Sequence, residues 1–182
     1  NHGGDTTQET STALVAYYMK GFMKYQHQND EIKKVMRAVN DTEGQILQAD
    51  LVPTLAMLMG VPIPFSSMGQ VLNDLYPVGD YATGNNQDCP DAAFEMQMLH
   101  DNHLNTLQIL NYFNRYQSEL HLFDKSEYGS IESLTKEVDA AYKIAQEMIS
   151  KNRQCEDSFH AIASNAIQKS QKLQAEVYEL VN

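Results

Sequence analysis

The sequence predicts an α/β stretch over residues 1–79, a linker over residues 80–90 and a helical region over residues 91–182. Three observations lead to this prediction. An apolar run of strand length lies near the start, Gly and Pro are concentrated in the first stretch, and apolar residues at helical spacing dominate the second. A chain of 182 residues, of which 42% are hydrophobic, has room for one ordinary domain or two small ones.

Composition excludes several classes of function. The formal net charge is −11, and an acidic chain repels nucleic-acid phosphates, so we expect no nucleic-acid partner. Two cysteines are too few for a disulfide scaffold. The chain begins at Asn1, has no signal-peptide pattern, and contains no apolar run near the ~18–20 residues that cross a bilayer.

The predicted strand is the apolar run from Ala13 to Met19, which is rich in Val and Tyr. Such a run is typical of a strand that is covered on both faces of an α/β sheet. A short buried helix has the same pattern, so this alternative stays open.

A short helix is predicted after Asp50, which stands where an N-cap residue is expected. Pro53 then falls in the first helical turn, where its missing N–H costs little. Gly60 suits the C-terminal end of a helix that stops at about Met59. The prolines in the next residues, 61–65, predict an extended backbone.

Three amphipathic helices are predicted after the turn-rich linker, because apolar residues recur there at intervals of three and four. The simplest interpretation is that the three helices pack on one another. The predicted buried stripes are Met96, Leu99, His103, Leu107, Leu110 and Phe113; Ile131, Leu134, Val138, Ala141, Ala145 and Met148; and Phe159, Ile162, Ala166, Leu173, Val177 and Leu180.

No complete catalytic constellation is visible in the residues themselves. His2 precedes two glycines and could present its imidazole on a tight turn, but one histidine does not make a metal site. His100 and His103 are three residues apart on a predicted helix, yet no third ligand follows at matching spacing. A satisfied buried histidine is the simpler interpretation of His103.

Two further features depend on the compartment. Cys89 and Cys155 would form a disulfide in an oxidising compartment, and both would be buried thiols otherwise; the sequence leaves both alternatives open. Asn40-Asp41-Thr42 is an acceptor sequence for N-glycosylation, with relevance only for a secretory or lumenal chain.

Two segments together resemble a known family. The first is Asn1-His-Gly-Gly-Asp-Thr-Thr-Gln-Glu-Thr, which is similar to the C-terminal metal-binding motif of the alkaline phosphatase superfamily. The second is Gln48-Ala-Asp-Leu-Val-Pro-Thr-Leu-Ala-Met-Leu-Met-Gly-Val-Pro-Ile-Pro-Phe. In this order they resemble the GPI ethanolamine phosphate transferases, over about residues 1–76. The resemblance implies that residues 1–79 are the C-terminal part of an alkaline-phosphatase-like catalytic domain.

The resemblance also implies an activity. The family transfers ethanolamine phosphate from phosphatidylethanolamine to a mannose of the GPI-anchor precursor in the lumen of the endoplasmic reticulum. It implies a two-zinc site, a threonine nucleophile that becomes a phospho-enzyme, membrane-spanning segments and a stabilising membrane subunit as partner. The nucleophile and most metal ligands are expected upstream of Asn1. We therefore expect a fragment of a longer membrane protein, with no catalytic residue in this chain and no activity by itself.

Few positions of this sequence match functional residues of the family. His2 matches the last zinc-binding histidine of the family, and Gly3 and Gly4 match the glycines after it. Asp5 and Glu9 resemble family positions that would orient this histidine, although a solvated turn explains them equally well.

Two alternatives stay open at this point. The first is another superfamily enzyme, a phosphodiesterase, phosphomutase or sulfatase. The second is a non-catalytic helical module that binds a basic partner through the acidic second stretch.

Overall fold

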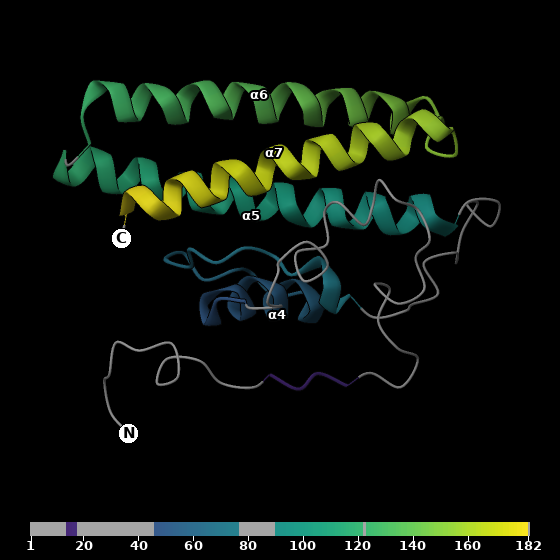
Figure 1. Cartoon of the computed structure of the whole chain (residues 1–182), viewed down its shortest axis with the longest axis horizontal. Helices are drawn as coiled ribbons and strands as arrows, with labels where there is room; N and C mark the ends of the chain where they lie inside the picture. Colours follow the sequence, from purple (N-terminus) through teal and green to yellow (C-terminus); the bar gives the residue numbers. More distant parts are fainter. Residues whose placement is uncertain (1–13, 18–45, 77–89, 122, 182) are drawn as a thin grey trace.

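The described part of the protein is helical. The computed structural model describes residues 14–17, 46–76, 90–121 and 123–181. Three long helices lie side by side, and a short helix lies along the lower side of this group (Figure 1). In chain order the elements are the 3₁₀ turn η2 (Gln48–Asp50), α4 (Leu51–Met59), the 3₁₀ turn η3 (Asn73–Leu75), α5 (Pro90–Leu120), α6 (Lys125–Ser150) and α7 (Asp157–Val181).

The α/β prediction is wrong for the described residues, which contain no strand. Leu14–Tyr17, inside the predicted strand, has no regular structure, and Val15 and Tyr17 are almost fully exposed. The extended backbone after Gly60 does not form a ladder either. Its amides at Gln70 and Leu72 donate to side chains of the η2–α4 segment. Side-chain acceptors therefore take the place of a neighbouring strand.

The predicted stripes of α6 and α7 face the core. α7 runs antiparallel to α6 and parallel to α5 (Figure 1), and its packing against both helices gives two apolar clusters, one near each end of the three helices. Asp124 begins α6 with a capping box, since its carboxylate accepts from the amides of Ser126 and Glu127 at 2.7 and 2.8 Å. The residues of the two predicted stripes that are buried, and so confirm the prediction, are Ile131, Val138, Ala141, Ala145, Met148, Phe159, Ala166, Leu173 and Val177.

The stripe predicted for α5 is only partly right. Leu107 is 41% exposed, although apolar spacing placed it in the core. The polar residues Asn102, Asn105 and Thr106 are buried instead of Leu107. The reason is that α5 has a second packing partner, the segment around residues 69–76, which contacts a polar face of the helix.

The short helix α4 begins and ends where the sequence predicts. Gly60 follows it with φ of 64°, the left-handed conformation that glycine adopts at no steric cost. Asp50 directly precedes the helix, but its side chain caps no amide of α4. The expected capping role of Asp50 at α4 is thus wrong, and its carboxylate instead accepts from the Leu47 and Gln70 amides. Among the described residues, no helix is long and apolar enough to cross a membrane.

Candidate functional site

Most of the site residues predicted from the resemblance lie outside the described residues. This holds for the expected zinc ligand, its neighbours, the glycosylation acceptor and one cysteine. Cys155 is described; it precedes α7 in the turn after α6, and it is not a free thiol. Its pairing with Cys89 stays a prediction. The predicted residues outside the described ranges are His2, Gly3, Gly4, Asp5, Glu9, Asn40 and Cys89.

The described residues do not fit a zinc site. Nowhere in residues 14–17, 46–76, 90–121 and 123–181 do three His, Cys, Asp or Glu side chains come together as a metal group. A catalytic zinc ion needs three protein ligands close together, and the donor side chains of these ranges are not grouped in that way.

What the structure does bring together is a buried polar network around the second family-like segment. Its centre is Asp50, which is 1% exposed. Asp50 Oδ1 accepts from the Gln70 amide at 2.7 Å, and Oδ2 accepts from the Leu47 amide at 3.2 Å. These two bonds join the turn before α4 to the extended segment twenty residues later. Hydrogen bonds of this kind to an ionised group are among the stronger ones in proteins.

Thr54 makes a parallel connection one helical turn further along. Its hydroxyl donates to the Asp50 carbonyl at 2.6 Å and accepts from the Leu72 amide at 2.9 Å. Both Thr54 and Leu72 are buried. The hydroxyl is therefore used as donor and acceptor together, which Val, of nearly the same shape, is unable to do.

Gly69 allows the two segments to approach. A Cβ atom at this position would lie 2.1 Å from the Ala49 carbonyl oxygen and 2.7 Å from the Asp50 amide nitrogen. Only glycine leaves space for such a backbone contact. On its other side, the Gly69 carbonyl accepts from Asn105 Nδ2 at 3.0 Å. The glycine is thus held between η2 and α5.

Side chains of α5 and α7 complete the network. Asn102 Nδ2 donates to Asn73 Oδ1 at 2.9 Å, and Gln174 Nε2 donates to Thr106 Oγ1 at 2.8 Å. All four side chains are buried. We call this network the motif junction, defined by Asp50, Thr54, Gly69, Gln70, Leu72, Asn73, Asn102, Asn105, Thr106 and Gln174.

Sequence reasoning missed most of the motif junction. Asn102, Asn105 and Thr106 do stand at helical spacing, so a second, polar stripe of α5 is visible in the sequence. Uncharged polar residues at that spacing are equally typical of a solvated face. The partners that make them buried, such as Asn73 and Gln174, are 29 and 72 residues away from Asn102 along the chain.

The prediction of a satisfied buried histidine at position 103 is only partly right, because His103 is half-buried and its Nδ1 atom has no hydrogen-bond partner among the described residues. Its ring stacks on Tyr142 of α6, with ring centroids 3.7 Å apart and planes 8° from parallel. Burial lowers the pKa of His103, an effect that His100 strengthens and Asp139 opposes. The neutral imidazole is therefore favoured in the folded protein.

A second histidine contact was not predicted. His160 Nδ1 of α7 lies 2.5 Å from Glu95 Oε1 of α5, and the Glu95 side chain is fully buried. The two residues are 65 positions apart, and no local pattern in the sequence links them. This pair ties the start of α7 to the start of α5.

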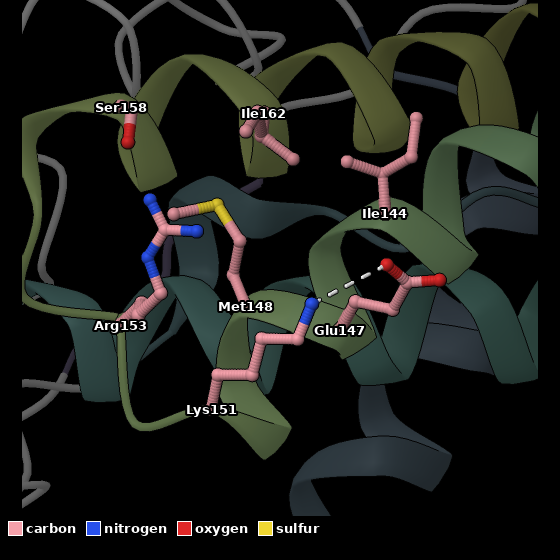
Figure 2. Close-up of a pocket in the computed structure, with 7 residues that line it drawn as sticks. All are labelled: Ile144, Glu147, Met148, Lys151, Arg153, Ser158 and Ile162. Atoms are coloured by element: carbon pink, nitrogen blue, oxygen red, sulfur yellow. Dashed lines mark ion pairs between the residues drawn. The ribbon is translucent and has the colours of Figure 1, made fainter.

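The cavity drawn in Figure 2 has a volume of about 360 Å³ and lies between the end of α6 and the start of α7. Its apolar lining includes Met148 and Ile162. The two cations at its rim are already matched by carboxylates: Lys151 lies 3.9 Å from Glu147, and Arg153 lies 2.6 Å from Glu156. The cavity is thus a poor anion site, because each positive charge has a neighbouring negative one.

Comparison with known proteins links the chain to one family. It is 28% identical to GPI ethanolamine phosphate transferase 3, catalytic subunit, from Homo sapiens over 144 residues, which is 79% of this chain and 11% of the relative. It is 40% identical to GPI ethanolamine phosphate transferase 2 from Kluyveromyces lactis over 82 residues, 41% of this chain and 10% of the relative. It is 36% identical to transferase 3 from Eremothecium gossypii over 80 residues, 41% of this chain and 7% of the relative.

The chain is a relative of the GPI ethanolamine phosphate transferases. It spans about a tenth of the length of the relatives just named. No protein-family model and no solved structure matches it. Similarity to transferase 3 is also what two short sequence segments indicate, Leu51-Val-Pro-Thr-Leu and Pro62-Ile-Pro-Phe, and the matches are consistent with it.

The similarity to transferase 3 covers more of the chain than the two motifs predict. An aligned segment of 144 residues is longer than residues 1–76, which contain the motifs that carry the resemblance. The alignment with the human protein therefore includes part of the helical region. This weighs against the interpretation of that region as an unrelated module for a basic partner.

Proposed function

We propose that the chain is part of a GPI ethanolamine phosphate transferase of the transferase 3 type, on the lumenal side of the endoplasmic reticulum membrane. The longer protein would move ethanolamine phosphate from phosphatidylethanolamine to a mannose of the GPI-anchor precursor. The observation that carries this proposal is the similarity over 79% of the chain to a protein named GPI ethanolamine phosphate transferase 3, catalytic subunit.

The proposed reaction exchanges one phosphate ester for another. The phosphorus–oxygen bond to diacylglycerol breaks, diacylglycerol leaves, and a mannose hydroxyl becomes the new ester oxygen. Zinc and a threonine nucleophile are proposed for the longer protein. We assign no step to them here, because the described residues do not form a metal group. A stabilising membrane subunit is proposed as partner on the family resemblance alone.

The described residues would have a structural role in this enzyme. The motif junction fixes α4 and the extended segment after it on the helical platform formed by α5 and α7. By itself the chain would be inactive, since the nucleophile and most metal ligands are expected upstream of Asn1. Incubation of the purified chain with phosphatidylethanolamine should release no ethanolamine phosphate.

The proposal is tested with the longer protein that contains this chain. It is expressed in cells whose GPI ethanolamine phosphate transferase 3 has been deleted, and the GPI precursors are analysed by mass spectrometry. Restoration of the missing ethanolamine phosphate group is the expected result. If the longer protein is made and reaches the endoplasmic reticulum but the group stays absent, the proposed function is wrong.

A further inference from the structure

The outer side of α4 is apolar and exposed. Val52, Leu55 and Leu58 recur every three residues, and each is exposed by more than two fifths. Met59, at the end of the helix, is 66% exposed. In Figure 1 α4 lies on the side of the three-helix group where α5 is. We call the four side chains Val52, Leu55, Leu58 and Met59 the outer face of α4.

The inner side of the same helix is already occupied. Thr54 and Ala56 are buried, and Met57 packs against the core cluster that includes Phe94 of α5. The helix is thus apolar on both sides, and a helix with this composition is normally covered all round. Leu51–Met59 also contains no charged residue, so nothing on the helix itself favours contact with water.

The exposed apolar surface extends beyond the helix. Val61 is 47% and Phe65 is 52% exposed, and the Phe65 ring contacts Tyr112 of α5 edge to face at 5.6 Å. The Phe65 carbonyl also accepts from Gln108 Nε2 at 2.6 Å. These contacts hold the residues after α4 firmly on α5, so their exposure belongs to an ordered segment.

We propose that the outer face of α4 is the docking surface for the remaining part of the transferase's catalytic domain. This inference rests on the proposed function. About nine tenths of the length of the matched relatives lies outside the matched segment, so a protein of that length has much further chain that could cover this face. α4 would then be a middle layer, joined to the helical platform through the motif junction and to the catalytic domain through its outer face.

The partner's chemistry follows from the composition of the surface. It has no charge and offers only methyl and methylene groups and a thioether, so a matching surface must be apolar and must satisfy its own hydrogen bonds. Substitution of the outer-face side chains by smaller ones would weaken this contact and leave the motif junction intact, because the two sides of the helix face different neighbours.

Cysteine labelling tests this docking. Leu55→Cys is placed on the outer face and Ala140→Cys, on the exposed side of α6, serves as the control. Each is introduced into the 182-residue chain and into the longer protein, and labelling by a water-soluble maleimide is followed by mass spectrometry of the modified peptide. In the longer protein in detergent, the cysteine at position 55 should react at least about tenfold more slowly than in the chain alone. The control should react alike in both.

Three outcomes would overturn the inference. The cysteine at position 55 reacts equally fast in both proteins; it is protected in phosphatidylcholine vesicles but not in detergent, which indicates lipid; or it is protected in the isolated chain at high concentration, which indicates a second copy. Met59→Cys, also on the outer face, repeats the test at a second position. Labelling is independent of catalysis, so a failed activity assay with a protected position 55 would refute the proposed function alone.

Discussion

Replacement of Gly69 by Ala tests the motif junction at its tightest point. The new methyl group would be built 2.1 Å from the Ala49 carbonyl oxygen and 2.3 Å from its carbonyl carbon. Both atoms belong to backbone, which has no rotamer that relieves the contact. Two segments would therefore have to separate by about 1 Å or more, given that carbon and oxygen atoms normally stay beyond about 3 Å.

The cost follows from the hydrogen bonds that this movement breaks. The Gln70 amide would lose Asp50 Oδ1, and the Gly69 carbonyl would lose Asn105 Nδ2. A bond to a charged group contributes about 1.5–3 kcal/mol and a neutral one about 1 kcal/mol, so Gly69→Ala should lower the free energy of unfolding by roughly 2.5–4 kcal/mol. For a chain of this length that corresponds to a fall in Tm of roughly 10 °C.

Gly129 provides the matched control. It lies inside α6, is exposed, and a Cβ added there would meet nothing within 4 Å. Gly129→Ala should raise the free energy of unfolding by about 0.5–1 kcal/mol, because alanine is the better helix former. Both variants are measured by urea denaturation followed by circular dichroism. A Gly69→Ala protein as stable as the wild type would refute the close approach of the two segments.

Two other predictions concern single side chains. Thr54→Val should destabilise the chain by about 1–3 kcal/mol, because the buried Leu72 amide loses its acceptor. Thr135→Val is the control, since Thr135 makes the same kind of bond to the carbonyl four residues earlier and should cost much less; equal losses would contradict the role of Thr54 as acceptor. Burial lowers the pKa of His103 in the folded state, so the unfolded state binds more protons between that lowered pKa and about 6.5. Stability should therefore fall as the pH falls through this window, and His103→Phe should reduce the difference between denaturation at pH 7.5 and pH 5.0, whereas His121→Asn, at an exposed position, should leave it unchanged.

Local patterns were sufficient for the helices that have one apolar face. The stripe of α6 is buried because this helix packs on α7 through one side, so apolar spacing and burial coincide. α7 packs on both α5 and α6, and its predicted apolar stripe is buried together with polar residues such as Gln174. The end of α4 at Gly60 was also predictable, because only a few residue types adopt φ of 64° without strain. In such cases one short window of sequence contains all the information that the conformation needs.

The motif junction was beyond the reach of these patterns. The role of Asp50 depends on a glycine 19 positions later that permits the approach, and no propensity describes such a pair. Asn105 is buried only because the Gly69 carbonyl lies against it. The predicted strand at Ala13–Met19 failed at Leu14–Tyr17 for a related reason: an apolar run becomes a strand only when another strand offers hydrogen bonds, and the described residues contain none.

Hydrogen exchange at two amides tests most directly whether the second family-like segment and the helical region fold as one unit. The amides of Gln70 and Leu72 donate to Asp50 and Thr54 and lie outside any helix. If the motif junction holds the segment on α5 and α7, both amides should exchange with the same free energy of opening as core amides of α7, such as Leu173. Exchange at Gln70 and Leu72 that is faster by orders of magnitude, with Leu173 still protected, would contradict this account.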